Sequence, residues 1–255
     1  MTAKYVRRGY DPNDPVWFSG RQLDILQLAH ADLRWLVDRG YKISTAATLV
    51  GNHYQLVARQ RNALLRSTCS SAQYDLRMAN RLGSNVLNSG PVLIDGLNVI
   101  ITLETALSKS MLITGDDGVL RDLASLRGSY RIISQTSQAI NLLFEALSDL
   151  GVTETVIYLD APVSNSGKLR QLLQELSTDW KLSVKTELVP DPDACLHDQD
   201  RIVTGDAVIL DRCRSWLNLA RSIVRQKIAD AWIVDLSLKQ TSQIMTKDDN
   251  IVLSH

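Results

Sequence analysis

The stretch Val92-Leu-Ile-Asp-Gly-Leu-Asn-Val99 decides the predicted fold, because it joins a strand to a helix with an acid at the junction. An apolar run ends on Asp95, the chain turns at Gly96, and a helix is expected to begin near Asn98. In α/β proteins, ligands bind at the carboxyl ends of the strands. Asp95 is therefore a candidate metal or phosphate ligand, provided that other acids join it.

The sequence on either side of this stretch divides into two regions. Residues 1–84 are predicted to form a helical domain, because apolar residues recur at helical spacing and no strand-like run interrupts them. Residues 85–255 alternate strand-like runs with helical stretches, which indicates βαβ units. We expect an α/β fold in which a central, mainly parallel sheet is flanked by helices and preceded by a small all-α domain.

The boundaries of the expected elements follow from hydrophobic periodicity and from turn residues. Strand-like runs cover residues 92–95, 111–114, 155–160, 182–189, 202–204 and 232–236. Helical stretches cover residues 98–107, 118–126, 138–150, 167–176 and 207–224. Residues 80–90 are rich in Asn, Ser and Gly and are predicted to be a linker.

The helical region has the outline of a helix-turn-helix. A short helix from Ile43, a break at Gly51-Asn52 and a second helix carrying three arginines fit that arrangement. These arginines are candidate contacts to nucleic-acid phosphates, and they are Arg59, Arg61 and Arg66. The same helices carry enough apolar residues to be an ordinary packing module, which is the alternative.

Two further strand-like runs end on an acid, as the first one does. Asp160 ends the run from Val156, and Asp206 follows a Thr-Gly turn after the run from Ile202. Parallel strands place their carboxyl ends along one edge of a sheet, so these acids converge with Asp95 if the strands are neighbours. Clustered carboxylates repel one another and suit a hard cation, Mg²⁺ or Mn²⁺. Each acid taken singly also fits a helix N-cap.

The fourth ligand of such a site is open among three acids. Asp116 and Asp117 follow a Thr-Gly turn, and Glu104 lies within the helix after Asn98. The pair of aspartates is equally compatible with a plain turn and a helix cap. The candidate catalytic residues are Asp95, Asp116, Asp160 and Asp206, and the candidate metal ligands are Asp95, Asp117, Asp160 and Asp206.

Basic and polar side chains near these acids are candidate substrate contacts. Arg121 and Arg127 suit phosphate binding, because a guanidinium meets two phosphate oxygens at once, although surface ion pairs are the alternative. Ser164 and Asn165 precede a helix whose amides favour an anion, and Lys168 adds positive charge. Capping of that helix is the simpler role for the polar pair, and phosphate contact would be an additional one.

The loop at residues 190–200 is strongly acidic, and it contains Asp191, Asp193, Asp198 and Asp200. Its prolines indicate a rigid, exposed turn. It lacks the arrangement of ligands found in EF-hands, so we predict a solvated loop rather than a calcium site.

Composition narrows the class of protein. Lys and Arg together number 28, as do Asp and Glu, so overall charge does not indicate a nucleic-acid or membrane partner. No apolar run approaches membrane-spanning length, and the N-terminus lacks the apolar stretch of a signal peptide. The three cysteines form no CxxC motif and are interpreted as reduced thiols. We expect a cytoplasmic protein with no membrane partner.

The acids and their neighbours resemble the PIN and NYN-type metal-dependent nuclease superfamily. The resemblance rests on Asp95 followed by Gly-x-Asn, on Asp160 in mid-domain, and on Ile-Val-Thr-Gly before Asp206. It covers roughly residues 91–236. The added helical region is similar to that of a prokaryotic group, of uncharacterised function, that joins a small helical module to a PIN-like domain.

The resemblance implies hydrolysis of phosphodiester bonds with Mg²⁺ or Mn²⁺ as cofactor, and RNA rather than DNA as partner. Asp95, Asp160 and Asp206 match metal acids, and Asn98 matches the polar residue that positions an acid or a phosphate. A homodimer is one option for the assembly. Two other functions stay open, namely a non-catalytic nucleic-acid-binding regulator with a degenerate PIN-like domain and a small-molecule phosphohydrolase.

Overall fold

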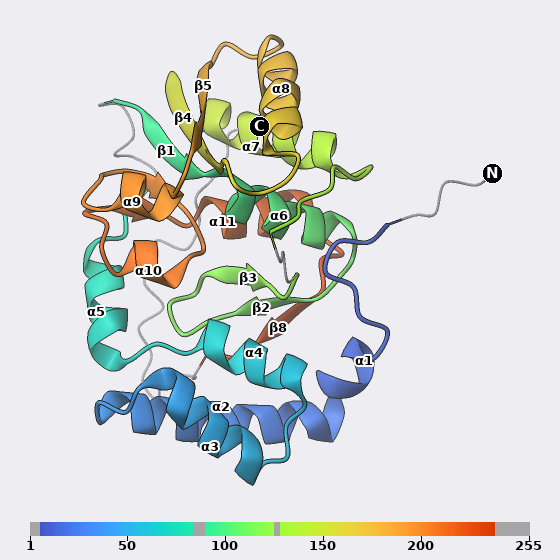
Figure 1. Cartoon of the computed structure of the whole chain (residues 1–255), viewed down its shortest axis with the longest axis vertical. Helices are drawn as coiled ribbons and strands as arrows, with labels where there is room; N and C mark the ends of the chain where they lie inside the picture. The colour runs from blue at the N-terminus through green and yellow to red at the C-terminus, as the bar shows by residue number, and fades with distance from the viewer. Residues whose placement is uncertain (1–5, 84–89, 125–127, 238–255) are drawn as a thin grey trace, which may run out of the picture.

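The computed structural model of the chain describes residues 6–83, 90–124 and 128–237 (Figure 1). The N-terminal region forms helices, as predicted, and the longest of them, with 19 residues, runs along the bottom of the molecule in Figure 1. Their bounds are α1 (Asp14–Trp17), α2 (Gly20–Asp38), α3 (Ile43–His53), α4 (Ala58–Ser67) and α5 (Ser71–Ala79). The boundary expected between residues 84 and 85, and most of the predicted linker, lie outside the described residues.

A five-stranded sheet in the order β5-β4-β1-β6-β7 forms the upper part of the molecule (Figure 1). Every pair in it is parallel, which confirms the predicted sheet type. The strands are β1 (Val92–Asp95), β4 (Glu154–Asp160), β5 (Ser183–Val189), β6 (Ile202–Val203) and β7 (Trp216–Leu217). The first strand along the chain is therefore the central one.

Helices cover both faces of this sheet, because alternate residues of each strand point to opposite sides. Val92 and Ile94 of β1 pack into the core under α6, α7, α8 and α11, whereas Leu93 faces the smaller core under α9 and α10. The first set comprises α6 (Gly96–Leu107), α7 (Thr136–Asp149), α8 (Ser166–Ser177) and α11 (Leu219–Lys227), and the second α9 (Pro192–Leu196) and α10 (Ala207–Leu210).

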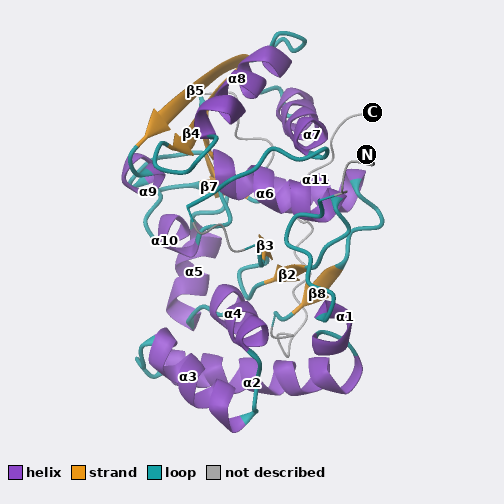
Figure 2. Cartoon of the chain, turned by 45° about the vertical axis from the view of Figure 1, so that its right-hand side comes forward, coloured by secondary structure: helices purple, strands orange, loops and turns teal. Residues whose placement is uncertain are grey.

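A second, three-stranded sheet was not expected from the sequence. Its order is β3-β2-β8, and its strands are β2 (Leu112–Thr114), β3 (Leu120–Asp122) and β8 (Ile233–Asp235). It lies between α6 and α11 above and the N-terminal helices below (Figure 2). Leu112 packs upward into the core of the large sheet, while Met111 and Ile113 pack downward onto α2, α3 and α4. The two regions of the chain thus share this small sheet.

The prediction of a helix over residues 118–126 is wrong for residues 118–124, which the structure describes. Gly118 has a φ of +71°, and the Asp117 side chain accepts a hydrogen bond from the Val119 amide. This turn folds the chain back, so that Leu120–Asp122 pairs antiparallel with β2 instead of forming a helix. Residues 125–127 lie outside the described residues.

The helix predicted over residues 207–224 is interrupted. The chain forms the single turn of α10, then β7, and then α11. Trp216 causes part of the interruption, because its side chain is fully buried and its backbone extends the sheet beside β6. The remaining predicted strands and helices of the second region are present within a few residues of their expected bounds.

The helix-turn-helix outline corresponds to α3 and α4. The predicted break at Gly51-Asn52 is not where the helix ends, since α3 continues to His53.

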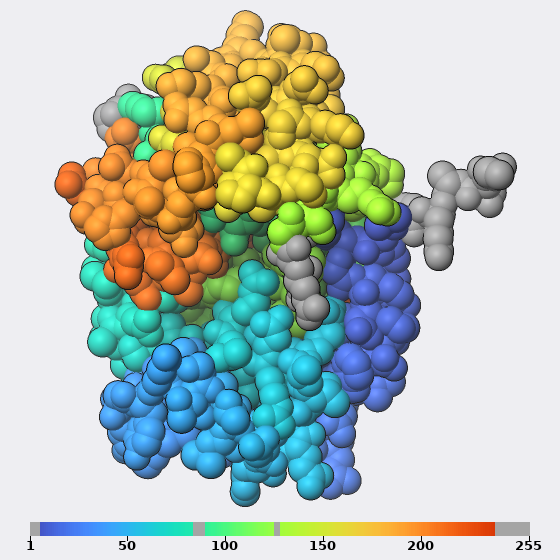
Figure 3. Space-filling model, viewed as in Figure 1, coloured from blue at the N-terminus to red at the C-terminus, as the bar shows by residue number. Residues whose placement is uncertain are grey.

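The segment before α1 lies along the side of the molecule against the α/β part (Figure 3). Among the described residues, no helix combines the length and apolar character needed to cross a membrane.

Candidate functional site

Three aspartates lie at the carboxyl edge of the large sheet. β1 pairs with β4 on one side and with β6 on the other, so the strands that lead to Asp95, Asp160 and Asp206 are immediate neighbours. The sequence predicted that these acids converge only if their strands are neighbours, and in the structure the strands are neighbours. The edge is therefore a place where the fold concentrates negative charge.

Asp95 lies at the centre of this edge and is buried, with 6% of its surface exposed. Thr204 Oγ1 donates a hydrogen bond to Asp95 Oδ2 at 2.7 Å and accepts one from the Asp206 amide at 2.9 Å. Burial is the main reason that the pKa of Asp95 rises to about 7. Negative charge on Asp206, Asp160 and Asp193 raises the pKa further, while the threonine hydrogen bond lowers it.

Asp206 has a structural role in addition to its place at the edge. Its Oδ1 accepts hydrogen bonds from the amides of Val208 at 2.7 Å and Ile209 at 3.3 Å, so it caps α10. The sequence predicted this cap as compatible with metal binding. The second carboxylate oxygen, Oδ2, takes no part in the cap.

Asp193 belongs to the acidic edge, although the sequence indicated a solvated loop. Part of that loop folds as α9, which places Asp193 where Asp206 and Asp160 raise its pKa, after a larger effect of burial. Burial and the charge of Asp191 raise the pKa of Asp160 in the same way. A signal was present, because Asp191 followed by Pro192 is a helix start, and Asp191 caps the Asp193 amide at 3.0 Å.

The structure does not bring Asp116 and Asp117 into this group. Asp117 forms ion pairs of 2.6 Å with both Arg77 and Arg121, and Asp116 lies 3.2 Å from Arg34 Nη1. Burial disfavours the charge on Asp117, but the two guanidinium groups outweigh it and lower its pKa to about 2. These acids are neutralised by arginines instead of facing the other carboxylates.

Glu104, the third candidate for the fourth ligand, also lies elsewhere. It is nine residues beyond Asp95 along α6, which corresponds to about 13 Å of helix. Its carboxylate pairs with Arg8 at 2.7 Å and accepts hydrogen bonds from Tyr130 Oη at 2.6 Å and from Thr136. This buried cluster fixes the segment before α1 to the α/β part.

The predicted substrate contacts separate into inward and outward groups. Asn98 Oδ1 accepts the Gly205 amide hydrogen bond at 2.7 Å, and Arg121 donates to the Gly205 carbonyl at 2.7 Å, so both hold the loop after β6. Asn165 begins α8 in a left-handed conformation, and its side chain donates to the Tyr130 carbonyl instead of capping the helix. Ser164 pairs with Ser129, Lys168 is exposed, and Arg127 lies outside the described residues.

The predicted nucleic-acid contacts of the helical region face the protein itself. Arg59 pairs with Asp14 at 2.5 Å and donates to two backbone carbonyls. Arg61 donates to the carbonyls of Leu56 and Gly51, so it ties the end of α3 to α4. Arg66 lies 3.7 Å from Asp122. These contacts favour the packing-module interpretation of the two helices.

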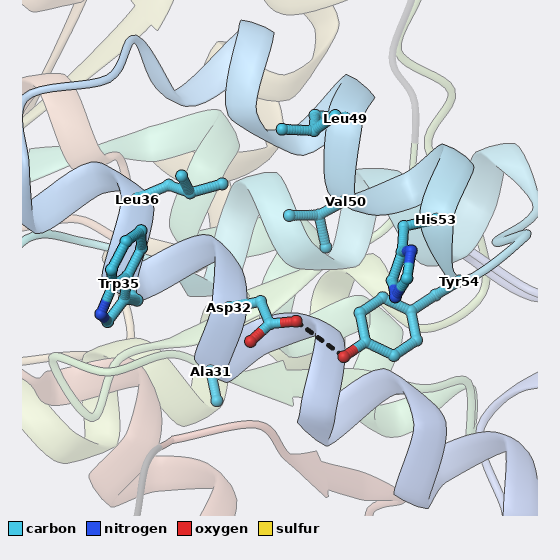
Figure 4. A pocket seen from close by; sticks show the side chains of 8 residues that line it. All are labelled: Ala31, Asp32, Trp35, Leu36, Leu49, Val50, His53 and Tyr54. Atoms are coloured by element: carbon cyan, nitrogen blue, oxygen red, sulfur yellow. Dashed lines mark hydrogen bonds between the residues drawn. The ribbon is translucent and has the colours of Figure 1, made fainter.

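Hollows on the surface of the described chain include one beside the acidic edge and one in the helical region. One has a volume of 430 Å³ beside the acidic edge, and it is lined by Asp191, Asp193, Ala194, His197, Val208 and Arg212. The other has 660 Å³ and lies between α2 and α3, where Tyr54 Oη donates to Asp32 at 2.7 Å (Figure 4). The smaller hollow shares Asp193 with the edge and adds a guanidinium and an imidazole to it.

The spacing of the acids is wider than that of a closed metal site. Among the residues that the structure describes, no three His, Cys, Asp or Glu side chains lie close enough together to hold a metal ion. The acids of the edge nevertheless shift one another's pKa, so they are close enough to interact electrostatically.

Residues 84–222, more than half of the chain, match the family described as domain of unknown function DUF5616. The chain belongs to this family. Residues 25–79 match a protein of unknown function, DUF434, and this match covers most of α2 through α5. The DUF5616 region holds every acid of the edge.

The chain is also similar to a curated protein of an archaeon. The uncharacterized protein MJ0935 of Methanocaldococcus jannaschii is 31% identical over 185 residues, which cover 72% of this chain and 88% of the relative. No solved structure matches the chain. Two segments with separate descriptions thus lie in one chain, and the contacts of Asp116 and Asp117 with Arg34 and Arg77 join them.

Proposed function

We propose that this protein is a metal-dependent hydrolase of phosphodiester bonds, with RNA as the favoured substrate, in the manner of PIN and NYN-type nucleases. One observation carries the proposal. Asp95 is a buried carboxyl at the centre of a parallel sheet edge, and its pKa rises towards neutrality beside Asp206, Asp160 and Asp193. A site that retains mutually repelling carboxylates in this way suits a bound cation.

The chemistry of the donors fits a hard divalent cation. The set consists of carboxylate oxygens, which Mg²⁺ and Mn²⁺ prefer, and it contains no thiolate or imidazole at its centre. Asp95, Asp160, Asp193 and Asp206 lie too far apart in the structure to hold a cation together as they stand, so its binding would draw their side chains inward. In this proposal Asp193 takes the place that the sequence left open among other acids. When bound, the cation supplies an activated water and neutralises phosphate charge.

The residues of the chain have distinct roles in this proposal. Thr204 orients Asp95 through the 2.7 Å hydrogen bond to its Oδ2. Because the pKa of Asp95 is about 7, this carboxyl loses its proton near neutral pH, where it becomes available as a ligand. Arg212 and His197 line the hollow beside the acids and would bind a phosphate group of the substrate there.

A small-molecule phosphohydrolase is the second candidate, and two observations favour it. The hollow beside the acids has a volume of 430 Å³, which is the size of a small-ligand pocket rather than of a groove for a long strand. In addition, Arg59 and Arg61 donate to the protein itself and do not extend a basic track towards the acids.

Mn²⁺ titration by calorimetry tests the proposal. The wild-type chain is compared with Asp95→Asn and Asp206→Asn, and with Asp198→Asn as a matched control from an exposed position in the same acidic loop. Loss of at least about tenfold in affinity in the first two variants, with no change in the control, is the expected result. Equal binding in all four proteins would overturn the metal site.

Cleavage assays then identify the substrate. A mixed RNA pool and bis(4-nitrophenyl) phosphate are each incubated with the wild-type chain and Mn²⁺, with and without a chelator. Chelator-sensitive cleavage of RNA supports the nuclease, and cleavage of the small ester alone supports the phosphohydrolase. RNA binding without metal-dependent cleavage of either substrate would contradict both and favour a non-catalytic regulator.

A further inference from the structure

The loop between β6 and α10, residues 204–206, is held by several side chains. It carries Asp206 and Thr204, the residues that cap α10 and orient Asp95. Its Gly205 amide donates to Asn98, and its Asp206 amide donates to Thr204 Oγ1. The position of the acidic edge therefore depends on how firmly this short loop is fixed.

Two arginines donate hydrogen bonds to the backbone carbonyls of the residues on either side of Asp206. Arg121 Nε donates to the Gly205 carbonyl at 2.7 Å, and Arg77 Nη2 donates to the Ala207 carbonyl at 3.3 Å. Asp117 joins the two arginines, because its carboxylate accepts both Nη atoms of Arg121 and Nη1 of Arg77. The three side chains form one buried clamp around the loop.

Arg77 reaches this clamp from the helical region. It lies in α5 with 2% of its side chain exposed, and its Nε donates to Asp211 Oδ1 at 2.7 Å. Asp211 directly follows the last residue of α10, so Arg77 contacts both ends of that helix, Ala207 at its start and Asp211 after its end. Gln73, one turn earlier in α5, donates to Asp211 at 2.7 Å as well.

The clamp affects the acidic edge by fixing the backbone of the loop more than by adding net charge to it. Its two guanidinium groups face the carboxylate of Asp117 and, through Arg77, that of Asp211, so these four charges largely cancel. Buried ion pairs of this kind contribute little net stability, because desolvation offsets the attraction between the charges. Fully satisfied polar networks do, however, select one arrangement of the backbone they contact.

We infer that Arg77, together with Asp117 and Arg121, is a positioning residue for the acidic edge. The guanidinium of Arg77 fixes the loop that carries Asp206 and, through Thr204, the orientation of Asp95. The DUF434 segment thus completes a site whose acids all lie in the DUF5616 segment. This inference rests on the proposed function for the role of the edge, but the fixing of the loop can be measured without it.

Hydrogen exchange and Mn²⁺ affinity test the inference in the full chain. Arg77→Met removes the hydrogen bonds of Arg77 to the Ala207 carbonyl, Asp117 and Asp211, whereas Arg77→Lys retains a single charged donor group. Arg59→Met is the matched control, because Arg59 also pairs with a buried aspartate and donates to two backbone carbonyls, but away from the loop. Exchange at the Gly205 and Asp206 amides reports on the loop, and that at the Leu33 amide in α2 reports on the rest of the fold.

Arg77→Met is expected to speed exchange at Gly205 and Asp206 by at least about tenfold relative to Leu33, and to weaken Mn²⁺ binding by about 10–100-fold. Arg77→Lys should fall between this variant and the wild type, since an ammonium cannot span Asp117, Asp211 and a carbonyl at once. Arg59→Met should leave the relative exchange rates and the affinity unchanged.

If Arg77→Met does not fold, Asp211→Asn takes its place in the test. The Asp211 side chain is 26% exposed, and its substitution weakens only the ion pair between Asp211 and Arg77. Unchanged relative exchange at the loop in every folded variant would overturn the inference. If the wild-type chain shows no Mn²⁺ binding but the variants free the loop, the proposed function fails and the positioning role of Arg77 stands.

Discussion

At the scale of single residues, Asp95 is a carboxyl whose place in the fold opposes stability. It is buried, its neighbours at the sheet edge are acids, and its pKa of about 7 lies well above the ordinary value of 3.8. A carboxyl whose pKa is higher in the folded than in the unfolded state favours folding at low pH. This contribution is lost as pH rises from about 4 through 7.

Asp95→Asn should therefore stabilise the protein when no metal is present. The expected gain in free energy of unfolding is about 2–4 kcal/mol at pH 8 and close to zero at pH 4, since the amide carries no charge to bury. Urea denaturation in the presence of a chelator measures it. Asp198→Asn, at an exposed acid, should show no such gain, and equal stability of wild type and Asp95→Asn at pH 8 would contradict the unfavourable burial.

At the scale of elements, α6 follows β1 without a loop, and this junction requires a glycine. A Cβ placed on Gly96 would lie 2.7 Å from Ile157 Cγ2, 2.7 Å from Leu159 Cδ2 and 2.9 Å from the Tyr158 carbonyl oxygen. The side chains belong to β4 and are packed in the core, and the carbonyl belongs to the backbone of the sheet. Only a residue without a side chain lets α6 begin this close to β4.

Gly96→Ala is expected to destabilise the fold by about 1–3 kcal/mol, because the added methyl group must displace the backbone of β4 or its packed side chains. Gly167→Ala is the control, since nothing lies within 4 Å of a Cβ at this position of α8. The control should be neutral or slightly stabilising, as alanine favours a helix. Thermal unfolding followed by circular dichroism compares the two variants, and an equal midpoint would argue against the tight junction.

The strength of the local signal decides which elements the sequence predicts. β1, β4 and α7 have clear apolar or periodic patterns, and they lie where expected. β3 is only Leu120–Asp122, and the residues around it also fit a helix, so its pairing with β2 is what makes it a strand. β7 has the same character, because Trp216 joins the sheet through a contact distant in the sequence.

The candidate site shows the same division between local and distant information. The strand ends identified Asp95, Asp160 and Asp206 because a residue at the end of a parallel strand has only one edge to occupy. Asp193 and Arg77 were missed, since each reaches the edge only after a separate helix folds against it. Asp116 and Asp117 were included because their sequence context does not reveal which arginines would pair with them.

At the scale of the whole molecule, the helical region and the α/β region share one interior. Met111, which precedes β2, and Ile113 of β2 pack among residues of α2, α3 and α4. Buried ion pairs link Arg34 and Arg77 to the β2–β3 turn. The boundary predicted between residues 84 and 85 separates a helical sequence pattern from an alternating strand and helix pattern. It does not separate two cores, because the described contacts extend across it.

The full chain is therefore expected to unfold in a single cooperative transition. Loss of the N-terminal helices would expose the apolar face of the small sheet, so neither region should remain folded after the other has unfolded. Scanning calorimetry gives the ratio of calorimetric to van't Hoff enthalpy, which should be close to one. Two resolved transitions, or a ratio well above one, would show that the regions are independent.

The strand order has a consequence for how the chain acquires its structure during synthesis. β1 is central, yet its partner β4 comes later, with Thr155 Oγ1 bonded to the Val92 carbonyl across 63 residues. β2 gains its parallel neighbour only from β8, close to the end of the chain. Contacts of such high sequence separation slow folding. The central strand β1 thus stays unpaired until β4 has been synthesised, and an exposed strand edge of this kind makes a partly made chain prone to aggregation.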